Sequence, residues 1–60
     1  MIDTYIEECI NARVNVIIFT TNGFQFRGVI VNDFCDHIIV KSDNKKSMIY
    51  KHAISTIQPQ

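Results

Sequence analysis

The chain has 60 residues, six acidic and six basic side chains and a formal net charge of zero. A domain this short buries only about 60% of its unfolded surface and is marginally stable alone, so we expect a partner subunit. Zero net charge argues against a general polyelectrolyte binder, and no apolar run approaches the roughly 20 residues that span a bilayer. Cys9 and Cys35 match no disulfide framework and no zinc motif, so we expect two buried thiols in a cytoplasmic protein.

An amphipathic helix is predicted over residues 2–11, where apolar side chains recur at helical spacing along one stripe: Ile2, Tyr5, Ile6, Cys9 and Ile10. The rest of the chain predicts five β-strands, at about residues 14–21, 24–31, 37–41, 46–50 and 54–58. Asn22-Gly23 is a strong hairpin signal and predicts a type I′ turn. Gly28 inside the second strand predicts a sharp bend, because strand interiors disfavour glycine.

This order of elements predicts a mainly β fold with an N-terminal α-helix, in a single domain over residues 1–60. Five short, strongly bent antiparallel strands are typical of a small open barrel of Sm-like or SH3-like type. The last two strands are short and apolar, and nothing in them protects an edge before Pro59. Head-to-tail pairing of such edges between subunits closes a ring.

Patterns for catalysis and metal binding are weak in this chain. Ser55 lies near His52, but no carboxylate is placed to orient that histidine, and no phosphate-cradling glycine loop is present. Asp33, Asp36 and His37 form a loose cluster of candidate metal ligands, although a solvated loop explains them more simply. We therefore expect no enzymatic activity, no metal, no cofactor and no small-molecule substrate.

Aromatic and polar side chains alternate around the predicted hairpin, as they do in proteins that bind single-stranded nucleic acid. The aromatic residues are Phe19, Phe24 and Phe26, and the interleaved polar residues are Asn22, Gln25 and Arg27. Bases stack on accessible rings, while polar neighbours supply hydrogen bonds. The alternative is that all three phenylalanines belong to the core. Phe19 is out of phase with Val16 and Ile18, which argues against that alternative.

Two segments resemble the signature blocks of Hfq, the bacterial Sm-like RNA chaperone family: residues 22–28, Asn-Gly-Phe-Gln-Phe-Arg-Gly, and residues 50–56, Tyr-Lys-His-Ala-Ile-Ser-Thr. The resemblance covers nearly the whole chain. It implies a homohexameric ring that regulates expression after transcription by holding messenger or small regulatory RNA. Its distal face would bind A-rich single strands, with adenines stacked on Phe19, through Phe19, Asn22, Gly23, Phe24, Gln25, Phe26, Arg27, Ser55 and Thr56.

The proximal face of such rings binds U-rich strands around the pore, and here the resemblance is incomplete. The residues that fall on this face are Lys51, His52, Cys35, Asp36 and Ile2. Ile2 stands where the family carries glutamine. Aligned without gaps, Asp36 takes the place of the family's stacking aromatic residue, whereas a one-residue shift places His37 there. The resemblance therefore implies a weakened uridine site.

The outer rim of the family often carries an arginine cluster, and this chain offers Arg13. Contacts between subunits are expected through Met48, Tyr50 and Ile54, on and beside the two edge strands. Three alternatives stay open. They are an Sm-fold interaction module or mixed-oligomer subunit with little RNA activity of its own, an SH3-like monomer that binds a peptide, and a small metalloprotein.

Overall fold

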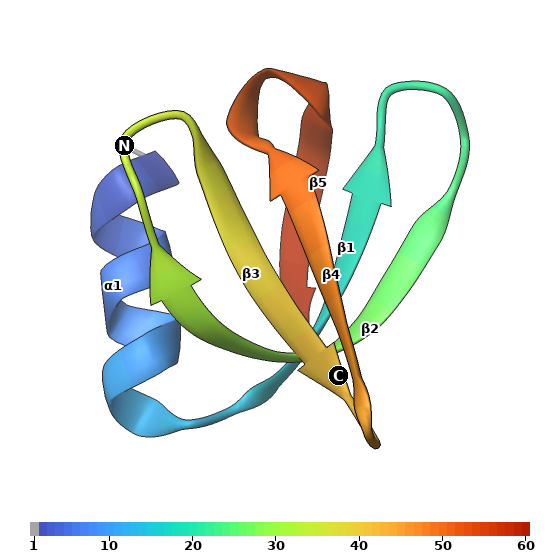
Figure 1. The fold of residues 1–60 in the computed structure, drawn as a ribbon. Helices are drawn as coiled ribbons and strands as arrows, with labels where there is room; N and C mark the ends of the chain where they lie inside the picture. The colour runs from blue at the N-terminus through green and yellow to red at the C-terminus, as the bar shows by residue number, and fades with distance from the viewer. Residues whose placement is uncertain (1) are drawn as a thin grey trace.

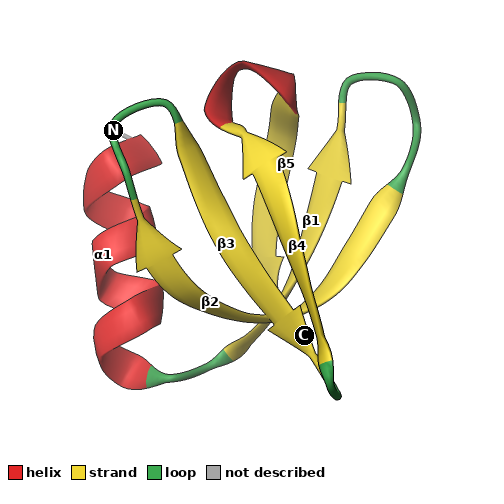
Figure 2. Ribbon diagram, viewed as in Figure 1, coloured by secondary structure: helices red, strands yellow, loops and turns green. Residues whose placement is uncertain are grey.

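The computed structural model describes residues 2–60, in which one helix precedes a five-stranded antiparallel sheet (Figure 1, Figure 2). The elements are α1 (Ile2–Ala12), β1 (Asn15–Thr20), β2 (Gln25–Asp33), β3 (His37–Ser42), β4 (Lys45–Tyr50), the 3₁₀ turn η1 (Lys51–Ala53) and β5 (Ile54–Pro59). The sheet order is β4-β3-β2-β1-β5, so β5 returns to pair with β1. The predicted fold class, a helix followed by five antiparallel strands in one sheet, is confirmed.

α1 packs along β2 (Figure 1). The helix is followed by a residue in the left-handed conformation. Its inward stripe buries Ile6 and Cys9, as the helical spacing requires. Arg13 has a φ of 54°, and the N–H groups of Arg13 and Val14 donate to the carbonyls of Ile10 and Cys9. This is a Schellman motif, whose left-handed position usually belongs to glycine. Arg13 therefore ends the helix at a conformational cost that glycine would avoid.

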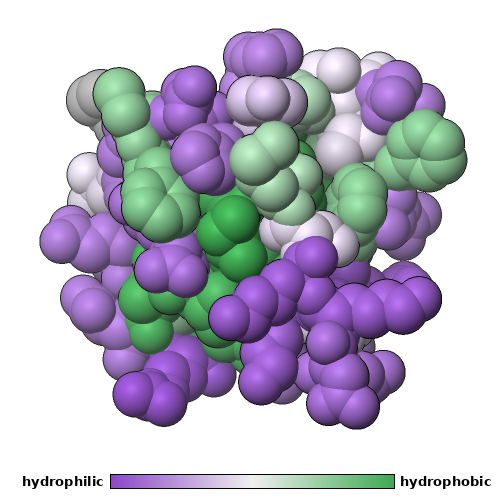
Figure 3. Space-filling model, in the orientation of Figure 1, coloured by the Kyte–Doolittle hydropathy of each residue, from purple (hydrophilic) through white to green (hydrophobic). Residues whose placement is uncertain are grey.

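The core is small and contains no aromatic side chain among its fully buried members: Ile6, Cys9, Val16, Ile18, Ile30, Ile38, Val40 and Ile49. On the view in Figure 3, apolar side chains reach the surface over β2 and β3, and hydrophilic side chains cover the β3–β4 hairpin. Cys9 is buried, but Cys35 is exposed in the loop after β2. The prediction of two buried thiols is therefore wrong for Cys35, because no apolar layer covers that loop.

β2 bends where it passes from the hairpin with β1 to the neighbourhood of α1. A Cβ atom on Gly28 would stand 2.3 Å from the carbonyl oxygen of Lys41, so only glycine lets the two strands approach here. Further along, the register with β3 shifts between Ile30 and Asn32, which leaves Val31 as an extra residue. Such a bulge bends a strand and increases its twist. The glycine and the bulge together shape the sheet around its core.

The β1–β2 loop is not the predicted type I′ turn. That turn needs positive φ at both central residues, but only Gly23 has it in this loop, with a φ of 93°. The N–H of Gly23 donates to the carbonyl of Thr20 at 3.1 Å, so the turn begins one residue earlier and Gly23 ends it. The longer loop places Phe24 outside β2.

β4 and β5 are the two outer strands of the sheet, as the sequence predicted. Within residues 2–60, neither strand pairs on its outer side. The ring of subunits that would form by pairing of these edges stays a prediction. Among the same residues, no helix has the length and apolar content needed to cross a membrane.

Candidate functional site

Residues of the predicted distal site lie in register across three neighbouring strands. Gln25 on β2, Phe19 on β1 and Thr56 on β5 form one row across the sheet. Arg27 lies two residues further along β2, opposite Ile17, and points to the same side. Residues opposite one another in antiparallel strands point to the same side of the sheet. We call this surface, with its adjoining loop and bulge, the hairpin face: Phe19, Asn22, Gly23, Phe24, Gln25, Arg27, Ser55 and Thr56.

The functional groups of the hairpin face make few contacts with the rest of residues 2–60. Arg27 Nη2 donates to Gln25 Oε1 at 3.5 Å, which is a weak bond. Phe19 is half-buried, and Phe24 is 63% exposed in the loop. Phe26 alternates to the opposite side and packs against the core, so the structure separates it from the other predicted distal residues. A ring supported from behind and open in front is suited to base stacking.

Thr20 fixes the loop of the hairpin face, and sequence reasoning missed this residue. Its hydroxyl donates to Asn22 Oδ1 at 2.6 Å and accepts the backbone N–H of Phe24 at 3.1 Å. This bond uses the Asn22 side-chain oxygen and leaves the amide nitrogen available as a donor. A threonine two residues before an Asn-Gly pair is a signal for such side-chain turns, so the sequence did carry the information.

A bulge in β5 completes the hairpin face. Phe19 pairs with Thr56 and Thr20 pairs with Ile54, which leaves Ser55 as the extra residue. The hydroxyl oxygens of Ser55 and Thr56 lie 3.4 Å apart, and both side chains are exposed. Two neighbouring hydroxyl groups therefore stand next to the Phe19 ring, where they can donate to or accept from a ligand.

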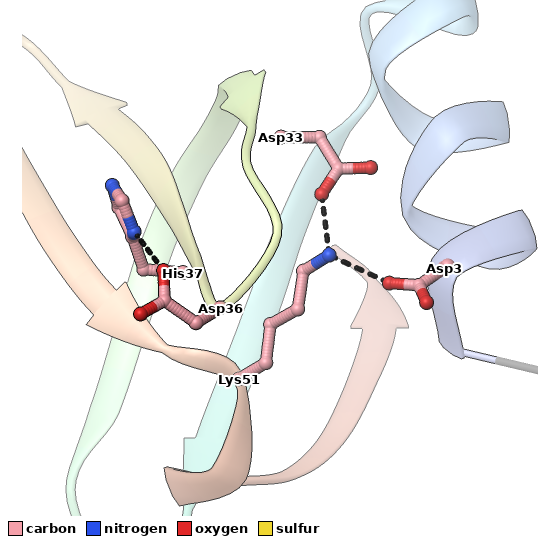
Figure 4. A network of polar contacts seen from close by, with 5 residues as sticks. All are labelled: Asp3, Asp33, Asp36, His37 and Lys51. Atoms are coloured by element: carbon pink, nitrogen blue, oxygen red, sulfur yellow. Dashed lines mark hydrogen bonds and ion pairs between the residues drawn. The ribbon is translucent and has the colours of Figure 1, made fainter.

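A second polar surface forms where the start of α1, the β2–β3 loop and η1 meet, and we call it the helix face: Asp3, Asp33, Cys35, Asp36, His37, Lys51 and His52. Its centre is Lys51, whose Nζ lies 2.6 Å from Asp3 Oδ1 and 2.7 Å from Asp33 Oδ1 (Figure 4). The bonds to Asp3 and then to Asp33 raise the pKa of Lys51 above its ordinary value. The backbone N–H of Lys51 also donates to the carbonyl of Asp36, which fixes η1 to the loop.

Four aromatic rings form a row beside this ion network. His37 stacks on Phe34 with centroids 4.7 Å apart, and Tyr50 lies edge-on to His37 at 6.4 Å and stacks on His52 at 5.5 Å. His37 Nδ1 lies 2.7 Å from Asp36 Oδ1, and this bond lowers the pKa of Asp36. Asp36 is exposed beside the row. Of the two candidates for the stacking position, His37 contributes a ring to this row, and Asp36 lies beside it as a hydrogen-bond partner.

The metal cluster considered from the sequence is not assembled. Asp33 turns to Lys51, whereas Asp36 turns to His37 (Figure 4). In residues 2–60, no group of three histidine, cysteine, aspartate or glutamate side chains is arranged to hold a metal ion. The carboxylates at the end of β2 and in the following loop serve as ion-pair and hydrogen-bond partners instead.

A family model described as "Hfq protein" matches residues 1–60. The chain belongs to the Hfq family. A relative called RNA-binding protein Hfq from Clostridium kluyveri is 40% identical over 57 residues, which are 95% of this chain and 70% of the relative. The protein of the same name from Clostridium botulinum strain Hall is 44% identical over 57 residues, 95% of this chain and 67% of that protein. A crystal structure of the pleiotropic translational regulator Hfq superposes with a TM-score of 0.88 at 36% identity, over 97% of this chain and 88% of the other.

The residues expected at subunit contacts, on and beside the edge strands, are accessible in the protomer. Met48 and Tyr50 are exposed on β4, and Ile54 is half-buried at the start of β5. A shallow groove of about 340 Å³ runs beside β5, lined by Ile2, Tyr5, Ile54, Ser55, Thr56 and Ile57. Ile2 was assigned to the proximal face, yet the groove places it near two hydroxyl residues of the hairpin face. An apolar groove at an open strand edge is suited to a neighbouring chain.

The predicted rim residue, Arg13, lies at the end of α1 beside a hollow of about 370 Å³. The hollow is otherwise lined by apolar residues: Ile10, Val29, Ile30 and Val31. Arg13 thus presents its charge next to apolar surface rather than within a cluster of arginines. The exposed Cys35 lies in the loop between the Asp33 and Asp36 carboxylates.

Proposed function

We propose that this member of the Hfq family is an RNA chaperone that binds A-rich single-stranded RNA on its hairpin face. The observation that carries the proposal is the register of Gln25, Phe19 and Thr56 across three strands. Phe19 offers a stacking surface, and the residues on either side offer hydrogen bonds to the edge of a stacked base. The Gln25 amide carries one donor group and one acceptor, which complement the N6 and N7 atoms of adenine. The mechanism is binding, with no chemical step.

We also propose that the protein acts as a homohexameric ring, in which β4 of one subunit pairs with β5 of the next. The accessible Met48 and Tyr50 side chains and the apolar groove beside β5 support this pairing. A chain this short is marginally stable alone, so burial of both edges would stabilise it. The ring would present identical stacking sites to one RNA strand, and each further site adds affinity through high local concentration.

The helix face is proposed as a secondary site for U-rich strands. His37 and His52 belong to the row of rings that a base would join, and His37 takes the stacking role that the ungapped alignment gave to Asp36. The ion pairs of Lys51 support a low affinity, because a bound ammonium is less available to phosphate. A lysine charge that contacts the RNA phosphates also positions the strand without distinguishing its bases.

The test is binding of labelled oligo-A, oligo-U and oligo-C to the purified protein at one salt concentration, with molecular mass measured by sedimentation. We expect the mass of a hexamer, tightest binding to oligo-A and weaker binding to oligo-U. Oligo-U binding as tight as oligo-A binding contradicts the assignment to the hairpin face. A folded ring that binds no oligonucleotide favours the interaction-module alternative, and a folded monomer excludes the ring.

A further inference from the structure

Lys51 carries two ion pairs that tie distant parts of the chain together. Its Nζ meets Asp33 at the end of β2 and Asp3 in the first turn of α1, at 2.7 Å and 2.6 Å (Figure 4). An ammonium has three donors, so two of them are already used. Bonds between ionised partners at such distances are among the stronger hydrogen bonds of proteins. An incoming phosphate would have to compete with two carboxylates for this one cation.

The two carboxylates differ in how far solvent screens them. The side chain of Lys51 is 15% exposed, that of Asp33 is 24% exposed, and that of Asp3 is 61% exposed. Solvent and salt weaken interactions of exposed charges much more than those of covered charges. Asp33 is therefore the less screened and more permanent partner, while Asp3, although its bond to Lys51 is slightly shorter, is the more easily displaced one.

The charges of the helix face add to this effect. Two carboxylates and one ammonium leave the Lys51 network with a net charge of −1, since −2 and +1 sum to −1. Asp36 contributes a further exposed carboxylate beside His37. Among the residues of the helix face, Lys51 is the one that carries a fixed positive charge. The face therefore attracts phosphate less than its lysine and histidine alone would suggest.

We propose that Asp33 is a specificity-determining residue, which holds Lys51 away from RNA phosphate and thereby disfavours U-rich single strands on the helix face. The inference rests on the proposed RNA-binding function and deepens it. It predicts that the protein prefers A-rich RNA partly because the Asp33–Lys51 ion pair weakens RNA binding on the helix face. Removing the Asp33 charge should increase RNA binding on the helix face without changing RNA binding on the hairpin face.

The experiment compares Asp33→Asn with the unmodified protein for oligo-U and oligo-A at fixed salt. Asparagine keeps the shape and removes the charge. Oligo-U affinity should rise about tenfold, the order expected for a charge and a phosphate ~6 Å apart in an effective dielectric of about 40. Its salt dependence should steepen by about 0.7 in the log–log slope for each phosphate newly neutralised. Oligo-A affinity should stay within twofold.

Three matched variants separate this effect from a general loss of negative charge. Asp36→Asn removes an exposed carboxylate of the same face that binds His37, and Asp43→Asn removes one from the β3–β4 turn. Both should change oligo-U affinity less than threefold. Asp3→Asn should give an intermediate gain, because Asp3 is the more exposed partner of Lys51.

A double-mutant cycle assigns the gain to the lysine. Lys51→Gln in the unmodified protein should lower oligo-U affinity less than threefold, because Lys51 is already bound to two carboxylates. In the Asp33→Asn background, Lys51→Gln should abolish the tenfold gain. A large loss from Lys51→Gln alone would show that the lysine already binds RNA and would overturn the proposal. Equal gains from Asp33→Asn and Asp43→Asn would overturn it too.

The outcome also distinguishes this inference from the proposed function. If the unmodified protein binds oligo-A and Asp33→Asn leaves oligo-U binding unchanged, only the role of Asp33 fails. If neither the unmodified protein nor any variant binds either oligonucleotide, the proposed function fails and this inference fails with it. Unchanged sedimentation of each variant shows that the ring and the fold are intact.

Discussion

The hairpin face and the helix face contain similar side chains in very different circumstances. Both have aromatic rings and a cation. On the hairpin face, the Arg27 guanidinium has one weak bond, and Phe19 is half-buried. On the helix face, the Lys51 ammonium is bound twice, and its rings already stack on one another. Residue type alone therefore does not define a binding surface, because the groups must also be free to contact a ligand.

The difference has a topological origin. The hairpin face draws on strands that pair directly, so its residues are ordered by the sheet and need no other partner. The helix face joins Asp3, Asp33 and Lys51 from three separate parts of the chain. Ion pairs hold these parts together, and the same ion pairs occupy the Lys51 ammonium that an RNA phosphate would otherwise contact.

Gly28→Ala should have the largest effect on stability, since it disturbs the pairing of β2 with β3, and both faces depend on that sheet. Its Cβ would stand 2.3 Å from the backbone oxygen of Lys41, which cannot move aside without separating β2 from β3. We expect a loss of about 3 kcal/mol or more in the free energy of unfolding, enough to unfold a marginal chain. Thermal denaturation followed by circular dichroism measures it. Gly23→Ala is the control, because its Cβ meets nothing within 4 Å and only its positive φ opposes the change.

Phe19→Ala should weaken RNA binding on the hairpin face and leave the helix face unchanged. Each base–aromatic stack is worth roughly 1–3 kcal/mol, and repeated stacks in a ring add to one another. Oligo-A affinity should therefore fall well over tenfold, while sedimentation and oligo-U affinity stay unchanged. Phe34→Ala is the matched control on the helix face and should leave oligo-A affinity within twofold. An unchanged oligo-A affinity in Phe19→Ala would refute the stacking role.

Arg13→Gly tests a region that belongs to neither face. The left-handed Arg13 backbone favours glycine, so this substitution should raise the free energy of unfolding by about 0.5–1 kcal/mol. Arg13→Ala removes the same charge without relieving the backbone and should not stabilise the protein. Chemical denaturation of both variants gives the comparison. A large loss of oligo-A affinity in either variant would move Arg13 into the binding surface.

Lys51→Gln should lower the stability of the protein slightly, by an amount that depends on pH. The folded-state pKa of Lys51 is raised above 10.5, first by Asp3 and then by Asp33. A group with a raised pKa contributes stability that is complete below its unfolded pKa and disappears as pH rises through the folded one. The melting temperatures of the variant and the unmodified protein should therefore differ near neutral pH and converge above pH 10.5. Lys46→Gln, at an exposed lysine of β4, should show no such convergence.

Much of the fold was predictable because it depends on local patterns. Val16 and Ile18 alternate on β1 as the sequence indicated, and both are fully buried. The apolar stripe of α1, the bend at Gly28 and the two open edge strands also follow from spacing and composition. The turn type was predicted wrongly, because Asn-Gly permits several turns and Thr20 selects among them with its side chain.

The site was predictable only in part, because its properties depend on distant partners. The alternation that places Phe19 outward also places Phe26 toward the core, and strand phase alone could have separated them. By contrast, no local pattern shows that Lys51 meets Asp3 and Asp33. Sequence spacing identifies groups capable of binding, whereas tertiary contacts decide which of them remain available.

The row of rings on the helix face gives the protein an intrinsic optical reporter. The chain has two tyrosines and no tryptophan, so Tyr5 and Tyr50 dominate its ultraviolet emission. Tyr50 lies against His52 and His37, whereas Tyr5 is half-buried beside the core. Any ligand that inserts into the row must disturb the Tyr50 ring, and Tyr5 supplies a steady background. Occupancy of this face can therefore be followed by fluorescence without attaching a dye.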